Sequence, residues 1–542
     1  MKTSIPMPFL YSLGWWNIYF IIKIGLFSQD IIGFHPLENF TLVAFLLIPL
    51  KTKVLKVIRQ CIAIPIGLWL MHFDSFLPPL DRLWNQMGQL LQFNFSYIIE
   101  LLGRFVSVQE LLSLFVLIIA YYFLNQIFRV SVFVVFALIY ISLPPYLFTE
   151  KPEDKAIVQQ TEIFKTTTPL LSDNDESGPV NDAVLNQAKD QFFKNEEQRT
   201  VAFPTIPPSV PFDLLFLSIC SVSWDDIEIA GLGNHPLLKE FDVMFDNFSA
   251  ATSYSGPAVI RLLRASCGQE THQELFSAPE SRQCFLFDNL AKLGYQENIL
   301  LNHDGKFDDF LQLIEEKGDL KAPLMSKIGL VPYQSAFDGS SIYRDKDVLN
   351  RWLNKRKNTE SGSTVALYNT ISLHDGNRII TASSKVGLES YKLRLKNLFD
   401  DLYAFFRTLE ASQRNVVVML VPEHGAGMRG DKMQIAGMRE IPASAIVNTP
   451  VGMKIFGGSI IRSGETVRVN APSSYLAVST LVSRILEQDI YNQKIFDPKV
   501  LIQGLPKIKM VAQNSGVTVM EYNNKPYVSL DDKTWTEYPI NK

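Results

Sequence analysis

The sequence predicts an N-terminal multi-span α-helical membrane domain followed by a C-terminal α/β domain, whose mostly parallel sheet is sandwiched by helices. The composition of the 542 residues changes sharply near residue 150, from apolar and aromatic to the mixture typical of a globular domain. The first part contains apolar stretches close to the ~20 residues that span a bilayer. The second part alternates strand-like and helix-like segments, which is typical of parallel sheets covered on both faces.

The apolar stretches of residues 1–150 predict about five membrane spans. The first stretch contains the charged residue Lys23, and it could also be a cleaved signal peptide. The pair Trp15-Trp16 and the absence of a small-residue cleavage site favour a span. We place the spans at Leu13–Phe27, Phe40–Leu50 continuing towards Ile58, Ile62–Phe73, Leu111–Phe128 and Val130–Leu147.

Basic residues in short loops predict the orientation of these spans. The loop residues on the cytoplasmic side would be Lys2, Lys51, Lys53, Lys56, Arg59 and Arg129. Five spans would then carry the rest of the chain to the extracytoplasmic side, which in a bacterium is the periplasm. The net charge of −4 and the lack of a basic stripe in the second half argue against a nucleic-acid partner.

The second half begins with a polar linker, residues 151–205, that contains a possible short helix near Asp182–Phe193. Strands and helices then alternate through the predicted catalytic domain, residues 206–542. The expected elements are strand Asp213–Ile219, a strand-like segment Phe241–Phe248, helix Ala258–Arg264, strand Thr364–Thr370, amphipathic helix Leu388–Leu409 and a strand over residues 415–421.

The most informative motif is Pro422-Glu423-His424-Gly425, directly after the apolar run Val416–Val421. Ligands and catalytic groups of open α/β sheets gather at the carboxyl ends of strands. A carboxylate beside an imidazole is a suitable pair of zinc ligands. From these four residues alone, the alternative interpretation is that Glu423 is a solvated acid and His424 an ordinary histidine in a turn.

Two further residues extend this motif into a candidate metal site. Cys220 follows a predicted strand, and its thiol is either buried packing or a metal ligand. Ser255 precedes Gly256-Pro257 and a predicted helix, so it is either a plain helix cap or a nucleophile stabilised by the helix dipole. With Glu423 and His424, the set offers four ligands to one Zn²⁺, which would lower the hydroxyl pKa.

His374 and Arg439 are candidates for handling a phosphate group. His374 follows a predicted strand and could stabilise a phosphate oxygen or protonate a leaving group. Arg439 could clamp phosphate oxygens through its planar fork, although an ion pair with Glu440 or a plain surface charge is the alternative.

At these residues the chain resembles the alkaline phosphatase superfamily and, more closely, the BcsG family of cellulose phosphoethanolamine transferases. The strings that carry the resemblance are Ser218-Ile219-Cys220-Ser221, Thr252-Ser253-Tyr254-Ser255-Gly256-Pro257-Ala258, Leu373-His374-Asp375-Gly376-Asn377, Val421-Pro422-Glu423-His424-Gly425 and Arg439-Glu440-Ile441-Pro442. The resemblance extends over nearly the whole chain, and Cys220 and Glu423 stand where most of the superfamily has aspartates.

This resemblance implies an alkaline-phosphatase-like fold in a bacterial inner-membrane enzyme. It implies a phosphatidylethanolamine donor, a cellulose acceptor modified at glucose 6-hydroxyls, and association with the cellulose synthase complex. Ser255 would be the nucleophile, and one Zn²⁺ would be held by Cys220, Ser255, Glu423 and His424. Tyr254, His374 and Arg439 would line the substrate site.

Two other functions stay open on the residues alone. A membrane-anchored phosphodiesterase or sulfatase-like hydrolase would use the same intermediate and pass it to water. The other open function is that of a non-catalytic scaffold that binds polysaccharide or the synthase. Separately, Cys267 and Cys284 lie close in sequence on the predicted periplasmic side, so we expect them to form a disulfide.

Overall fold

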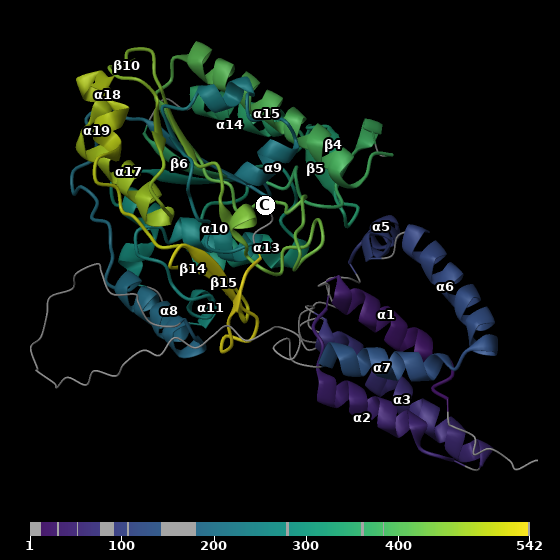
Figure 1. Cartoon of the computed structure of the whole chain (residues 1–542). Helices are drawn as coiled ribbons and strands as arrows, with labels where there is room; N and C mark the ends of the chain where they lie inside the picture. The colour runs from purple at the N-terminus through teal and green to yellow at the C-terminus, as the bar shows by residue number, and fades with distance from the viewer. Residues whose placement is uncertain are drawn as a thin grey trace, which may run out of the picture. The chain divides into compact units, whose positions relative to one another are not determined.

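The computed structural model describes residues 12–29, 32–50, 52–75, 92–105, 108–142, 180–277, 281–358, 362–382 and 384–539. The described residues divide into two units, with the divisions after residues 79, 104 and 178 (Figure 1). The first unit is all helical and the second is α/β, as the composition of the two halves predicts. Helix α5 (Phe95–Phe105) belongs to the second unit up to residue 104.

The first unit consists of apolar helices. They are α1 (Trp16–Ser28), α2 (Pro36–Leu47), α3 (Lys53–Asp74), α6 (Val108–Ile127) and α7 (Val130–Ser142). Among the described residues, α3 is long and apolar enough to cross a membrane, and α6 with α7 passes the same test as a pair bent by 111°. Helices α1 and α2 are apolar but shorter. Length and composition therefore support one or two of the five predicted spans.

The predicted loop between the second and third spans is instead the start of α3. Thr52 caps this helix by accepting a hydrogen bond from the Leu55 backbone N–H at 3.4 Å. Lys53, Lys56 and Arg59 all lie inside the helix, whereas Lys51 lies outside the described residues. Lysine and arginine are good helix formers, so a basic cluster marks a helix end less reliably than a glycine or proline would.

The charged residue of the first apolar stretch has buried partners. The Lys23 ammonium lies 2.5 Å from the Asp74 carboxylate, and both side chains are fully buried. Lys23 also donates to the Asn39 side-chain oxygen at 2.8 Å. A charge is tolerated in apolar surroundings when it is paired, so Lys23 does not count against a buried or membrane-embedded helix.

The second unit is built on a seven-stranded sheet of order β11-β2-β9-β8-β1-β6-β3. Its strands are β1 (Asp213–Ile219), β2 (Val243–Phe245), β3 (Gln296–Leu301), β6 (Thr364–Thr370), β8 (Val416–Leu420), β9 (Gly452–Phe456) and β11 (Val467–Val469). Strand β1 runs parallel to both β6 and β8, but β9 runs antiparallel to β8 and β2, so the sheet is mixed. Between β8 and β9 the chain forms only the short helix α16 (Ser444–Val447), without the long crossover helix that a parallel return needs.

Helices cover both faces of this sheet. Leu214 and Phe216 of β1 pack in one core with residues of α10 (Ser255–Leu263), α13 (Phe310–Gly318) and α17 (Tyr475–Glu487). Leu215 and Leu217 belong to a second core on the other face, together with residues of α14 (Asp345–Asn358) and α15 (Gly387–Ser412). Figure 1 shows α14 and α15 next to each other. A strand buried on both faces is what the uninterrupted apolar runs predict.

The folded part of the second unit begins earlier than the predicted boundary at residue 206. Helix α8 (Asp182–Glu196) includes the predicted short helix, but it is not part of a free linker. Its residues Leu185, Phe192 and Phe193 pack with a small sheet of β13 (Val511–Asn514), β14 (Val517–Tyr522), β15 (Lys525–Ser529) and β16 (Thr536–Glu537). The apolar positions repeat at helical spacing, so this face is buried on folding.

Cys267 and Cys284 form a disulfide, as predicted. Their sequence separation is 17 residues, so removing the bond with a double Cys→Ala change should lower the free energy of unfolding by about 3 kcal/mol in the chain-entropy account. Denaturant titration of the detergent-solubilised chain measures this loss. Alkylation of the unfolded, unreduced chain should modify only Cys61 and Cys220, the two free cysteines. Four alkylated thiols would contradict the disulfide.

Candidate active site

The carboxyl ends of three parallel strands bring the candidate residues to one edge of the sheet. Strand β1 pairs in register with β6 and β8, with Ile219 opposite Thr370 and Leu217 opposite Leu420. Pairing continues past β1, since Cys220 and His424 form an isolated parallel bridge. The predicted clustering of strand-end residues is therefore present in the fold.

Cys220, Glu423 and His424 form a buried group whose ligand atoms all lie within 4.8 Å of one another. The Ser255 Oγ lies 3.2 Å from the Cys220 Sγ and 3.5 Å from the His424 Nε2. All four predicted ligands are thus together. Ser255 is the first residue of α10, so its hydroxyl is next to the unpaired backbone N–H groups of a helix start.

The electrostatics of this group favour a cation. Burial, followed by the Glu423 carboxylate, raises the pKa of Cys220 to about 12. Burial also raises the pKa of Glu423 and lowers that of His424 well below its usual value. The Glu423 Oε2 is buried and has no hydrogen-bond partner among the described residues. A thiolate, a carboxylate and a neutral imidazole fit a zinc ion in both donor type and charge.

The ring orientation of His424 suits a metal ligand. Its Nδ1 lies 2.8 Å from the Gly425 carbonyl oxygen, to which the Nδ1–H donates in the neutral tautomer. The lone pair is then on Nε2, the atom that lies near Ser255. A backbone carbonyl that fixes the tautomer is the usual arrangement around ligating histidines.

Sequence reasoning missed two residues that support Glu423. The Ser218 hydroxyl donates to the Glu423 Oε1 at 3.1 Å, and the Asn369 amide donates to the same oxygen. Both are buried polar side chains within strands β1 and β6. A polar residue in a strand buried on both faces needs a partner, and this signal could have identified them.

Asn514 also escaped the sequence analysis, and it joins the nucleophile segment to the Arg439 loop. Its side-chain oxygen accepts from the Thr252 hydroxyl at 3.0 Å and the Ser253 backbone N–H at 3.2 Å. Its amide donates to the carbonyl oxygens of Arg439 and Glu440 at 3.2 and 2.8 Å. Nothing in the sequence around this C-terminal hairpin indicates such a role.

The predicted phosphate-handling residues lie around the same group. The Arg439 Nη1 is 3.5 Å from the His424 Nδ1, and its charge interacts with Cys220 and Tyr254. Burial, followed by the charge of Arg439, lowers the pKa of His374 to about 4. At neutral pH this imidazole is therefore neutral, so it can take up a proton or donate one hydrogen bond. Tyr254 is the residue before the first turn of α10.

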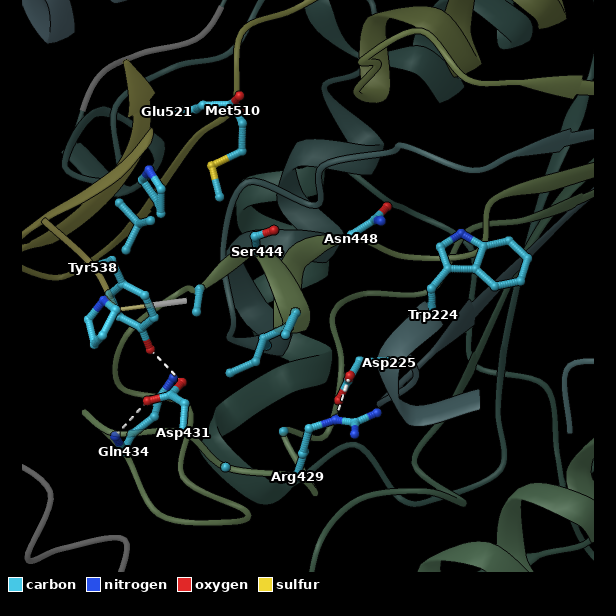
Figure 2. Close-up of a pocket in the computed structure, with 18 of the residues that line it drawn as sticks. Trp224, Asp225, Arg429, Asp431, Gln434, Ser444, Asn448, Met510, Glu521 and Tyr538 are labelled. Atoms are coloured by element: carbon cyan, nitrogen blue, oxygen red, sulfur yellow. Dashed lines mark hydrogen bonds and ion pairs between the residues drawn. The ribbon is translucent and has the colours of Figure 1, made fainter. Parts of the chain in front are cut away.

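A cavity of about 800 Å³ is lined in part by the loop that connects His424 to Arg439 (Figure 2). Gly427 and Met438, from the loop between His424 and Arg439, line it. Figure 2 shows Trp224 on one side and Tyr538 on the other, where the Tyr538 hydroxyl donates to Asp431. The cavity is thus lined by aromatic, acidic and amide side chains.

Comparisons with known proteins identify relatives of the chain over nearly its whole length. The family model "Cellulose biosynthesis protein BcsG C-terminal domain" matches residues 171–535, and the corresponding N-terminal domain model matches residues 16–143. The cellulose biosynthesis protein BcsG of Escherichia coli K12 is 40% identical over 556 residues, covering 99% of each chain. That of Salmonella typhimurium LT2 is 40% identical, covering 99% of this chain and 98% of its own.

Solved structures show a more distant similarity. A protein in the alkaline phosphatase superfamily from Vibrio parahaemolyticus is 14% identical with a TM-score of 0.45, covering 66% of this chain and 91% of its own. Family membership rests on the sequence matches, which extend over both halves of the chain. The chain therefore belongs to the family of the cellulose biosynthesis protein BcsG.

Proposed function

We propose that this chain transfers phosphoethanolamine from phosphatidylethanolamine to glucose 6-hydroxyls of cellulose, through a covalent phosphoethanolamine–enzyme intermediate. The observation that carries the proposal is the Ser255 hydroxyl at a helix start, in contact with a buried thiol and imidazole. Membership of the BcsG family supports a role in cellulose biosynthesis.

Cys220, Ser255, Glu423 and His424 would hold one Zn²⁺. Thiolate and imidazole ligands select zinc over magnesium, which prefers oxygen ligands alone. Zinc would lower the pKa of the coordinated hydroxyl, so that an alkoxide is available near neutral pH.

With Ser255 as the nucleophile, the reaction proceeds as two successive displacements at phosphorus. In the first, the Ser255 Oγ bonds to the donor phosphorus, the bond from phosphorus to the diacylglycerol oxygen breaks, and that oxygen takes up a proton. In the second, a glucose 6-hydroxyl loses its proton and bonds to phosphorus, and the Ser255 Oγ leaves. His374 would move these protons, while Arg439, Tyr254 and the N–H groups of α10 hold the phosphate oxygens.

A covalent intermediate suits substrates that lie in different phases. The donor is in a bilayer and the acceptor is a polysaccharide outside it, so direct transfer would require both to reach the same phosphorus atom at once. A serine that carries the phosphoethanolamine group between them removes this requirement, because it splits the transfer into two steps. We accordingly place the chain in a bacterial inner membrane as a multi-pass protein, with its second unit in the periplasm and the cellulose synthase complex as partner.

The test uses the full chain in vesicles of phosphatidylethanolamine labelled in the headgroup, with cello-oligosaccharides as acceptor. We expect label on the glucan and an equal amount of released diacylglycerol, because each turnover breaks one bond to diacylglycerol and forms one to sugar. Labelled phosphoethanolamine free in solution, with none on the glucan, would identify a hydrolase. Binding of glucan without any diacylglycerol release would identify a scaffold.

A further inference from the structure

Helix α5 (Phe95–Phe105) lies in sequence between the apolar helices α3 and α6, yet it contacts the loops of the candidate active site. Its residues up to 104 belong to the unit that contains the central sheet. Neither the sequence motifs nor the proposed chemistry assign it a role, and its polar side chains point to a specific one.

The side chains of α5 hold Asp375, the residue after His374. The Arg104 Nη1 and Nη2 lie 2.6 and 2.9 Å from the two carboxylate oxygens of Asp375, which is a bidentate pair. The Tyr97 hydroxyl donates to the same carboxylate at 2.8 Å. The Arg104 and Asp375 side chains are 18% and 10% exposed, so solvent screens the pair only weakly. Burial raises the pKa of Asp375, but Arg104 and Tyr97 lead the contributions that together bring this pKa below its usual value, so the carboxylate stays ionised.

Asp375 in turn positions His374. The His374 Nδ1 lies 2.9 Å from the Asp375 carbonyl oxygen, so the orientation of the imidazole depends on this backbone. Phe337 also supports the ring, since it is stacked on it with centroids 4.3 Å apart. The Phe337 carbonyl accepts from the Asn94 backbone N–H at 2.9 Å, just before α5. The segment that contains α5 therefore supports His374 from two directions.

Two glycines show how closely α5 approaches the loop that carries His374 and the loop that carries Arg439. A Cβ at Gly376 would lie 2.6 Å from the Tyr97 ring, and one at Gly437 would lie 2.5 Å from the Arg104 guanidinium. Gly437 is two residues before Arg439. Helix α5 thus packs against the loop of His374 and the loop of Arg439 at the same time.

Glu100 anchors the helix on the side of α15. It pairs with Arg104 at 3.0 Å and with Arg378, and it accepts from the Gly387 backbone N–H at 3.1 Å. One face of α5 therefore contacts Asp375, Arg378 and Gly387, so a shift of the helix would displace the loop that carries His374.

We infer that Arg104 and Tyr97 are positioning residues of the phosphoryl-transfer site, which act through Asp375 and the close packing at Gly437 to fix His374 and Arg439. The inference rests on the proposed function for the identity of the reaction. Arg104 touches neither the metal ligands nor Ser255, so its loss should leave metal binding intact and affect the geometry of phosphate recognition.

The experiment compares Arg104→Gln, Asp375→Asn, the double variant and Tyr97→Phe in the full chain. With a soluble chromogenic phosphoethanolamine ester, Arg104→Gln and Asp375→Asn should each lower kcat roughly 10- to 100-fold, the range for displacement of a catalytic group by about 1 Å. The double variant should be no worse than the more severe single one, because the two residues act as a unit. Tyr97→Phe should have a smaller effect in the same direction. Zinc content should match the unmodified chain in all four.

A matched control separates positioning from a general loss of stability. Arg414 pairs with the buried Asp213 at 2.6 Å, with 24% and 1% of the side chains exposed, at the opposite edge of the same sheet. Arg414→Gln should lower the melting temperature and leave kcat unchanged. Affinity for inorganic phosphate is a second readout that needs no turnover, and it should fall in Arg104→Gln but not in Arg414→Gln.

Two results would overturn the inference. One is a kcat and a phosphate affinity unchanged in Arg104→Gln, and the other is fully additive losses in the double variant. Failure of the proposed function would look different, because the unmodified chain would then put no label on the glucan. The phosphate-affinity comparison between Arg104→Gln and Arg414→Gln would still decide the role of α5.

Discussion

A full chain carrying Ser255→Ala should release no diacylglycerol from phosphatidylethanolamine vesicles and should lose at least about 10⁴-fold of its transfer rate, as expected when a covalent nucleophile is removed. The unmodified chain, treated with donor and no acceptor, should carry a phosphoethanolamine adduct on Ser255 that mass spectrometry detects. The physical reason is that, within the described residues, Ser255 carries the hydroxyl that lies within hydrogen-bond distance of both the Cys220 thiol and the His424 imidazole.

A suitable control is Ser266→Ala, which removes another serine of the same unit. Ser266 follows the last turn of α10, and its hydroxyl forms a hydrogen bond with the Ser479 hydroxyl at 3.1 Å. This variant should keep both the adduct and the transfer rate. An active Ser255→Ala chain, or an adduct on a different residue, would refute the assignment of the nucleophile.

Cys220→Ser should lose the bound zinc and, with it, the activity. A neutral hydroxyl is a far poorer zinc ligand than a thiolate, and we expect the affinity to fall by more than roughly 100-fold, the most that losing an outer-shell partner usually costs. Zinc affinity of the unmodified chain should rise with pH. Binding must expel the thiol proton, and burial followed by Glu423 raises the pKa of Cys220 to about 12 in the metal-free site.

Elemental analysis of the purified chain, with metal-buffered titrations at two pH values, tests this prediction. The unmodified chain should contain one zinc ion, and Cys61→Ser should contain the same amount because Cys61 is an exposed cysteine of α3. A stoichiometric zinc ion in Cys220→Ser, or two ions in the unmodified chain, would contradict the proposed ligand set.

The strands and the grouping of the candidate ligands were predictable because their signals are local. Strands β1 and β6 have the predicted bounds, since each is an apolar run that ends in polar residues. Cys220, Glu423 and His374 each follow such a strand, so parallel pairing alone brings them to one edge. The direction of β9 was not predictable, because it depends on the path of the chain between β8 and β9 and on no residue within the strand.

The supporting residues could not be predicted for a related reason. Asn514 is 261 residues from Ser253, and Arg104 is 271 residues from Asp375. A single arginine or asparagine is common in any helix or hairpin, and its partner is determined only by the folded chain. The helical start of α3 was missed because basic residues were interpreted as a loop, although they also favour helices.

The location of Arg104 affects how this family can be recombined. A chimaera that joins the first 179 residues of one relative to the remainder of another would separate α5 from the loop it supports. If the incoming residue at position 104 were neutral, the Asp375 carboxylate would remain largely buried without its counter-charge, an arrangement that costs several kcal/mol. Exchanging residues 92–104 together with the second half avoids this. Positions 104 and 375 should accordingly change together during the divergence of the family.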